Sequence, residues 1–156
     1  SECSVDYDTY QVEATCTLNN SIIGGDTSAD MNQCTGSGGG IYLGDPHSIL
    51  NINGTISINN NASVKDGGGI ANYGVVNISA TGTIHLNQCG TTTAGKGGGI
   101  CNFAGSSCSL SGSGTINENK CIISGGHGGG IYNETGATYS NTGWTFNGNT
   151  PDQVYP

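Results

Sequence analysis

Gly38-Gly39-Gly40-Ile41 decides the fold, because the same four residue types occur four times along the chain. The other copies are residues 67–70, 97–100 and 128–131, and their isoleucines follow one another after 29, 30 and 31 residues. Self-similarity at a period of roughly 20–50 residues is typical of a solenoid, in which each copy forms one coil of a stack. The sequence therefore predicts a repeat architecture.

A second motif, Gly-Thr-Ile, recurs with the same period at residues 54–56, 82–84 and 114–116, with the variant Gly-Trp-Thr-Phe at residues 143–146. Gly, Ser, Asn and Asp residues, which favour turns, separate the apolar segments, and no stretch has the 3.6-residue period of a helix. Three short strands per copy predict an all-β fold, a parallel β-helix of about four to five coils.

The repeat divides the chain into two regions. Residues 34–156 carry the glycine repeat and are expected to form the β-helix domain. Residues 1–33 fit the repeat poorly, so we expect an irregular segment that caps the stack or donates a strand to a neighbouring chain.

Stacked coils place equivalent residues above one another at about 4.7–4.9 Å, the spacing of strands in a sheet. The repeats predict two inward apolar columns and one amide ladder, in which each Asn side chain bonds both upward and downward. These columns are Ile41, Ile70, Ile100 and Ile131; Ile56, Ile84, Ile116 and Phe146; and Asn59, Asn87, Asn119 and Asn149. Glycine triplets suit a tight corner where backbones approach closely.

The charge content excludes several classes of function. Only 9% of the 156 residues are charged, against about 25% in an ordinary domain, and the net charge is -8. Arginine is absent, which argues against a nucleic-acid interface, and no apolar run is long enough to span a membrane. The acidic residues do not pair in matching columns and the three histidines do not converge. We therefore expect no enzyme activity, no cofactor and no metal site.

Seven cysteines without zinc-ligand spacing indicate an oxidising, extracellular location and a mature chain whose export signal has been removed. Cys89 and Cys121 occupy the same place in adjacent coils, so we expect a disulfide between them. Cys101 and Cys108 could close a small loop. The cysteines left for one further bond and one thiol that could reach a neighbouring subunit are Cys3, Cys16 and Cys34. The alternative is that several are buried small apolar residues.

Two outward rows complete the predicted coil. Ser37, Asp66, Lys96 and His127 precede the glycine triplets and should stack on one edge, with Asp66 and Lys96 forming an exposed ion pair. Tyr42 and Tyr132 share a second column. That column is interrupted by Ala71 and Cys101, which argues against a continuous aromatic platform.

The Gly-Gly-Gly-Ile repeats, together with Phe146-Asn147-Gly148-Asn149, resemble the Gly-Gly-Ala-Ile and Phe-x-x-Asn repeats of right-handed β-helix passenger domains. Those repeats belong to polymorphic outer-membrane proteins and related autotransporter adhesins. Similar repeats occur in surface proteins of methanogenic archaea, including the amyloid-like, cysteine-linked cell sheath. The resemblance implies a right-handed coil and a place at the cell surface.

A short, weakly charged stack with open ends favours pairing with further copies of itself. We therefore expect a structural subunit of an extracellular self-assembling sheath, surface layer or filament, held by strand stacking and disulfides. Its partners would be copies of the same chain, with no nucleic acid and no membrane insertion. The alternative is a β-helical adhesin or carbohydrate-binding module.

Overall fold

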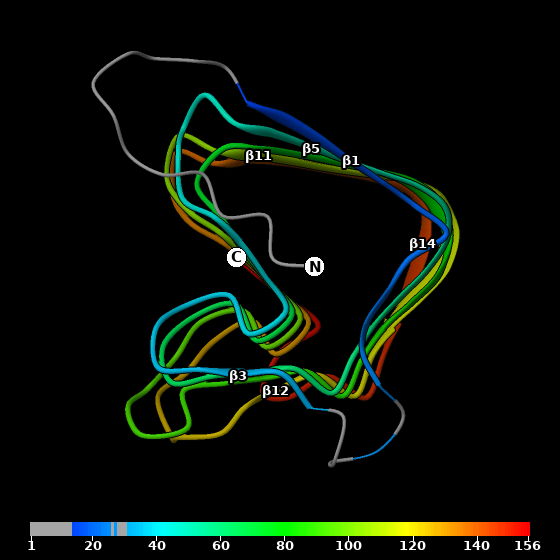
Figure 1. Ribbon diagram of the computed structural model, residues 1–156. Helices are drawn as coiled ribbons and strands as arrows, with labels where there is room; N and C mark the ends of the chain where they lie inside the picture. Colours follow the sequence, from blue (N-terminus) through cyan, green and yellow to red (C-terminus); the bar gives the residue numbers. More distant parts are fainter. Residues whose placement is uncertain (1–13, 26, 28–30) are drawn as a thin grey trace.

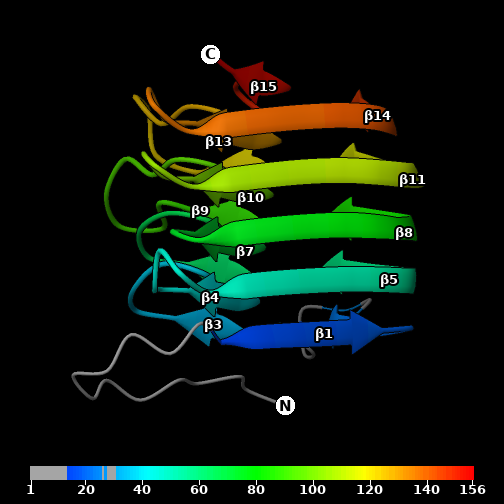
Figure 2. The ribbon, with the colours of Figure 1, turned by 90° about the horizontal axis from the view of Figure 1, so that it is seen from above.

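The computed structural model describes residues 14–25, 27 and 31–156, and it confirms the predicted all-β solenoid. Figure 1 views the stack along its axis, where successive coils lie over one another, and Figure 2 shows the coils one above the other from β1 to β15. Every pairing between strands is parallel, as stacking of consecutive coils requires. The described residues contain no helix.

Three sheets form the walls of the stack. The long sheet has the order β1 (Thr15–Asn19), β5 (Ile49–Asn59), β8 (Val75–His85), β11 (Ser107–Asn117) and β14 (Thr138–Asn147), and β2 (Ile22–Gly24) also pairs with β5. The Gly-Ile sheet contains β4 (Ile41–Leu43), β7 (Ile70–Asn72), β10 (Ile100–Asn102), β13 (Ile131–Asn133) and β15 (Val154–Tyr155). The short sheet contains β3 (Gln33–Cys34), β6 (Ala62–Ser63), β9 (Gln88–Cys89) and β12 (Lys120–Cys121).

The glycine triplets form the predicted corner between the short sheet and the Gly-Ile sheet. The first glycine of the second triplet, Gly67, has a φ of 64°, a left-handed conformation that favours glycine. The next residue, Gly68, lies so close to the coil above that an added Cβ would be 2.4 Å from the carbonyl oxygen of Gly98. Close approach of backbones, rather than a ligand, therefore explains the triplet.

The first isoleucine column is confirmed. Ile41 pairs with Ile70, Ile70 with Ile100 and Ile100 with Ile131, and Val154 of β15 continues the column. The three upper isoleucines are fully buried. Burying one such side chain contributes about 1.5–3 kcal/mol, so the column is a main source of stability.

The second apolar column is shifted by two residues in its lowest coil. Ile84, Ile116 and Phe146 stack as predicted, but the residue beneath Ile84 is Ile58 and not Ile56. The prediction aligned the copies on their glycines, whereas Gly54 does not pair with Gly82. A two-residue shift keeps every side chain on its own face of a strand, so the apolar alternation permits either register.

Ile56 is still buried, because it lies in the column of two glycines. Ile56 pairs with Gly82, and above them Gly114 pairs with Trp144. Gly114 leaves room for the indole, since a Cβ there would be 2.7 Å from the ring of Trp144. The indole N–H donates to the carbonyl of Ser111 at 2.9 Å. Trp144 of β14 thus fills the core of the last coil.

The predicted segment 1–33 lies partly outside the described residues. Its described strands, β1 and β2, pair with β5 of the same chain. They form the lowest layer of the long sheet.

Candidate functional site

The predicted amide ladder exists, and it also follows the two-residue shift. The rung below Asn87 is Asn61 and not the predicted Asn59. Nδ2 of Asn61 donates to Oδ1 of Asn87 at 2.8 Å. Asn87 donates to Asn119, and Asn119 donates to Asn149, both at 2.9 Å. Asn59 instead donates to the hydroxyl of Ser57. The sequence placed three of the four rungs correctly.

Each rung bonds to the backbone as well as to its neighbours. Nδ2 of Asn119 donates to the carbonyl of Ile84 at 2.8 Å, and its Oδ1 accepts from the backbone N–H of Asn87 at 3.0 Å. The middle rungs are fully buried. No buried side-chain polar atom among the described residues lacks a partner. The ladder therefore places amides inside the coil without the cost of unsatisfied groups.

The ladder has a direction and two ends. In every rung the lower Nδ2 donates to the upper Oδ1. Asn32 extends the ladder downward by donating to Asn61 at 2.8 Å, and Gln153 extends it upward by accepting from Asn149 at 2.7 Å. Both end residues are exposed.

A second amide ladder was not predicted. Asn72 donates to Asn102 at 2.7 Å, and Asn102 donates to Asn133 at 2.8 Å. The signal was present in the sequence, because three of the four glycine repeats read Gly-Gly-Gly-Ile-x-Asn, with Leu43 at this position in the first.

Cys89 and Cys121 lie in register in β9 and β12, as predicted, and their Sγ atoms are 3.1 Å apart. Cys121 accepts a hydrogen bond from the Cys89 thiol, which lowers the pKa of Cys121 and raises that of Cys89. Both side chains are buried. The geometry suits a bond between adjacent coils, and the disulfide itself stays a prediction.

The structure does not bring Cys101 and Cys108 together. Cys101 packs with Ala71 and Phe103 in a small outer cluster, whereas Cys108 lies in the main core. Burial raises the pKa of Cys108 to about 12. Cys101 lies in β10 of the Gly-Ile sheet and Cys108 lies in β11 of the long sheet. Their closeness in sequence therefore does not bring the two thiols together.

The remaining cysteines have separate positions. Cys34 lies in β3 beside Ser63 of β6 and not beside another cysteine. Cys16 lies in β1 and packs against the main core. Cys3 lies outside the described residues.

The row before the glycine triplets stacks as predicted, but its ion pair is different. The Asp66 carboxylate accepts the backbone N–H of Lys96 at 2.8 Å, and the Lys96 ammonium lies 3.3 Å from Glu134. The same ammonium lies 4.8 Å from the centre of the Tyr132 ring. Burial raises the pKa of Asp66, although the Lys96 N–H opposes that shift. Glu134, and not Asp66, is the side-chain partner of Lys96.

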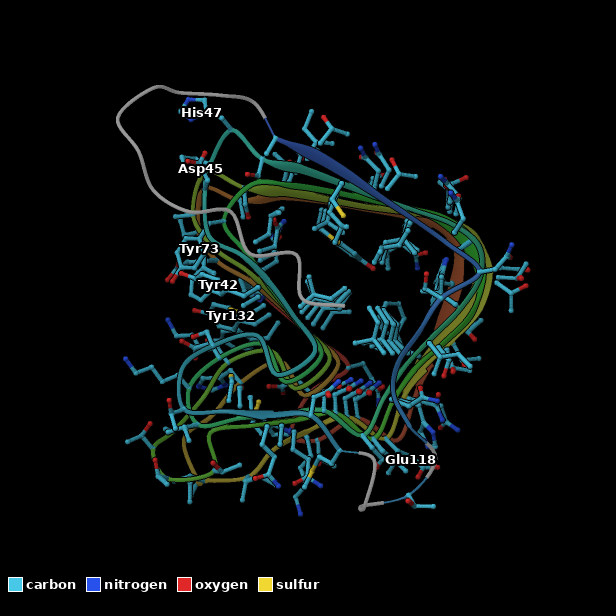
Figure 3. The ribbon with its side chains drawn as sticks, viewed as in Figure 1. Tyr42, Asp45, His47, Tyr73, Glu118 and Tyr132 are labelled. Atoms are coloured by element: carbon cyan, nitrogen blue, oxygen red, sulfur yellow. The ribbon has the colours of Figure 1, made fainter. Side chains whose placement is uncertain are left out.

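Aromatic side chains form a row beside the Gly-Ile sheet, where Figure 3 shows Tyr42, Tyr73 and Tyr132 on one side of the coil. Ala71 and Cys101 do interrupt the Tyr42 column, as predicted. Tyr73 and Phe103, two residues further along, cover these small residues and stack on each other at 4.0 Å with an interplanar angle of 8°.

The row continues through Tyr132 and Tyr155, whose ring centres are 5.6 Å apart at an interplanar angle of 16°. Tyr155 also stacks on His127 at 4.3 Å. At the other end, Tyr42 meets the edge of Tyr73 at 5.9 Å. Aromatic residues therefore line the stack from β4 to β15, which column alignment alone did not reveal.

The three histidines of the chain lie in three separate places among the described residues. Each histidine lies near a different carboxylate: His47 near Asp45, His85 near Glu118 and His127 near Asp152. No group of three or more His, Cys, Asp or Glu in the described part of the chain could hold a metal ion.

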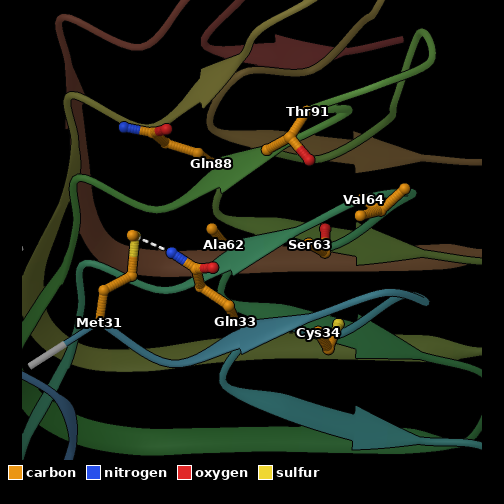
Figure 4. A pocket seen from close by; sticks show the side chains of 8 residues that line it. All are labelled: Met31, Gln33, Cys34, Ala62, Ser63, Val64, Gln88 and Thr91. Carbon is orange, nitrogen blue, oxygen red and sulfur yellow. Dashed lines mark hydrogen bonds between the residues drawn. The ribbon is translucent and has the colours of Figure 1, made fainter.

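A shallow depression lies on the short sheet, and Figure 4 shows Met31, Gln33, Cys34 and Gln88 among its lining residues. The amide of Gln33 contacts the sulfur of Met31 at 3.9 Å. The lining contains no carboxylate and no histidine, so it offers no acid–base pair.

Comparison of the chain with protein-family models, with curated proteins and with solved structures finds no match. The resemblance to β-helix surface proteins therefore remains an interpretation of the motifs. The described residues form no helix that is long and apolar enough to cross a membrane.

Proposed function

We propose that the chain is a structural subunit of an extracellular self-assembling sheath, surface layer or filament. The observation that carries this proposal is that, among the described residues, the outermost strands of the long and Gly-Ile sheets pair on one side only and carry no charge. Copies of the chain are its partners, strand stacking joins them, and disulfides strengthen the assembly.

The strands that end each sheet lie at the two ends of the stack (Figure 2). β14 and β15 form the C-terminal end, and each pairs with a strand on one side only. β1, β2 and β4 end their sheets at the other side of the stack, where each pairs with one strand among the described residues. An open strand exposes a row of backbone N–H and C=O groups that can bond to another chain.

These strands lack two of the devices that normally prevent such pairing, charge and proline, although a bulge interrupts the register of β14 with β11 between Ser111 and Gly114. None of β1, β2, β4, β14 and β15 contains a charged residue or a proline. Soluble proteins usually place lysine, proline or a bulge on an exposed edge. Proline does occur next to these strands: Pro151 follows the last bridge beside the short sheet, and Pro156 follows β15.

The end coils also leave core residues partly uncovered. Leu18, Ile23 and Ile41 are partly buried at the N-terminal end, and Phe146 and Val154 are partly buried at the C-terminal end. Their counterparts in middle coils, including Ile84 and Ile100, are fully buried. Stacking of a further copy would complete this burial, at about 25 cal/mol for each Å² of apolar surface.

The extracellular assignment rests on the cysteines. Seven cysteines in 156 residues suit an oxidising environment, and Cys89 and Cys121 already face each other between coils. A bond between them would join two coils of one chain, while the odd number of cysteines leaves one for a neighbouring subunit.

A variant of the C-terminal edge tests the proposal. Ser140 and Thr145 are exposed on β14, and changing both to lysine should raise the lowest concentration at which polymers form by about tenfold, or about 1.4 kcal/mol. The matched control changes Ser109 and Thr115, which lie directly beneath them on β11. Both variants disrupt the 3.2 Å contact between the Ser140 and Ser109 hydroxyls, so only the position of the new charges differs.

Polymers would be measured by sedimentation and by electron microscopy, with and without thiol reductant. The native chain should form filaments or sheets, and the control variant should form them at nearly the native concentration. Strictly monomeric native protein under non-reducing conditions would sink the proposal.

The alternative, a carbohydrate-binding module, draws on the aromatic row. Sugars stack on the faces of aromatic rings, but Tyr73 and Phe103 already cover each other's faces. Tyr42 and Tyr155 are more exposed, at 52% and 37% of their surface. Binding of the isolated chain to a glycan array would favour this alternative over assembly.

A further inference from the structure

We infer that copies of the chain join head to tail in one register, with β15 of one copy pairing in parallel with β4 of the next, so that Tyr42 stacks on Tyr155. This inference rests on the proposed function, because it specifies the contact through which the subunits assemble. Three observations support it: matching columns, matching ladder ends and exposed end rings.

The strands β4 and β15 occupy the same columns of the Gly-Ile sheet. Val154 and Tyr155 pair with Ile131 and Tyr132, and these columns descend through β10 and β7 to Ile41 and Tyr42. Continuing the stack in register therefore places Ile41 on Val154 and Tyr42 on Tyr155. It also sets Asp152 and Gln153 at the corner that glycines occupy in the coils below, so this corner must open for two copies to join. Both end strands carry an aliphatic residue followed by a tyrosine.

The middle coils differ from the ends in this column. They carry Ala71 and Cys101 where the end strands carry Tyr42 and Tyr155. Tyr42 and Tyr155 are exposed to 52% and 37%, although the rings between them pack on one another. Each exposed ring thus ends the aromatic row at one end of the stack. A further copy would continue the row at the ring spacing already seen between Tyr132 and Tyr155.

The buried amide ladder makes the two ends complementary. Each Asn donates Nδ2 to the Oδ1 of the coil above, from Asn32 to Asn149. Gln153, in the same coil as Asn149, accepts from Asn149 where the Oδ1 of a following rung would lie, so the C-terminal end of the ladder offers the Nδ2 donor of Asn149. Asn32 uses Nδ2 for Asn61, which leaves its Oδ1 as an acceptor at the N-terminal end.

This polarity favours head-to-tail contacts over symmetric ones. Two C-terminal ends would bring donor to donor, and two N-terminal ends would bring acceptor to acceptor. A head-to-tail contact also keeps the strands parallel, as they are throughout the stack. Because both ends of every copy stay usable, such a contact repeats without closing and yields a filament.

Cysteine cross-linking tests the register. In the double variant Tyr42→Cys/Tyr155→Cys, neighbouring copies would place the two new cysteines about 4.8 Å apart, within the Cα separation that a disulfide allows. The control Tyr42→Cys/Tyr132→Cys places them about two strand spacings, or roughly 9.6 Å, apart. Oxidised polymers made from a mixture of ¹⁴N- and ¹⁵N-labelled chains would be digested and analysed by mass spectrometry.

The expected result is a mixed-isotope peptide linking positions 42 and 155 in the first variant and no 42–132 link in the control. Polymers that lack the 42–155 link would overturn the register while leaving the proposed function intact. A native chain that forms no polymer would overturn both.

A second pair of variants covers the case in which the cysteines themselves prevent assembly. Tyr155→Phe keeps the ring and should polymerise at the native concentration, whereas Tyr155→Ala should need about tenfold more protein. Equal behaviour of these two variants would refute stacking on Tyr155.

Discussion

At the scale of single residues, Glu134 and Lys96 form an ion pair beside the Gly-Ile sheet. The backbone N–H of Ala104 donates to the Glu134 carboxylate at 3.1 Å and lowers the pKa of Glu134, and Lys96 lowers it further. Burial acts to lower the pKa of Lys96, but Glu134 and Tyr132 together outweigh it and raise the pKa. Glu134 therefore connects Ala104, in the loop before β11, to Lys96.

Replacing Glu134 with Gln should lower the free energy of unfolding at pH 7 by less than about 1 kcal/mol, because both side chains are partly solvated. The pKa of Glu134 in the folded protein is lower than its ordinary value of 4.5. The ionised carboxylate therefore stabilises the fold at any pH above 4.5, and this stabilisation is lost as the pH falls through the folded-state pKa. The difference in stability between the native and Glu134→Gln proteins should therefore become smaller as the pH falls below 4.5.

Urea unfolding at pH 7 and pH 3 would measure this difference. Glu118→Gln serves as the control, since Glu118 is more exposed and lies 3.5 Å from His85. A loss of stability from Glu134→Gln that is as large at pH 3 as at pH 7 would show that the charge is irrelevant.

At the scale of elements, the amide ladder depends on which asparagine follows β5. Asn61 is fully buried and bonds to Asn32, Asn87 and the carbonyl of Ile23. Asn59 is also largely buried, but it bonds only to the hydroxyls of Ser57 and Thr83. The two residues are alike in chemistry and differ in what they connect.

Changing Asn61 to Ala should lower the free energy of unfolding by about 3 kcal/mol or more, because several buried groups lose partners at about 1–3 kcal/mol each. Asn59→Ala should cost only about 1 kcal/mol. Chemical denaturation of both variants measures the difference. A larger loss from Asn59 would restore the register predicted from the sequence.

Strand existence and coil period could be predicted from the sequence, because the glycine corner and the inward isoleucines recur in every copy. The register of β5 could not, because a shift of two residues preserves the inward face. The Gly-Thr-Ile motif begins five residues after the start of β5 but seven after the starts of β8 and β11, although these strand starts are paired, so alignment on the motif gives the wrong register. The ion pair of Lys96 with Glu134 could not be predicted, because residue spacing does not fix the direction of a side chain. The same holds for the stacking of Tyr73 on Phe103.

At the scale of the whole molecule, the charged side chains of the described residues lie away from the strands that end the long and Gly-Ile sheets. The net charge of -8 repels approaching copies, but no charge stands on the outermost strands of the two longer sheets. A stack of five coils is only about 24 Å tall at the sheet spacing. Repulsion between copies should therefore depend strongly on the screening length.

Polymerisation of the native chain should require less protein as salt rises at pH 7. The screening length is about 30 Å at 0.01 M salt, longer than one copy, and about 8 Å at 0.15 M, so added NaCl confines the repulsion. Lowering the pH toward the isoelectric point near 4.3 should act in the same direction. Light scattering across a NaCl series would measure the threshold concentration, with sorbitol of equal osmolarity as the control. Dissolution of the polymers by salt would mean that ion pairs, and not uncharged strand edges, hold the copies together.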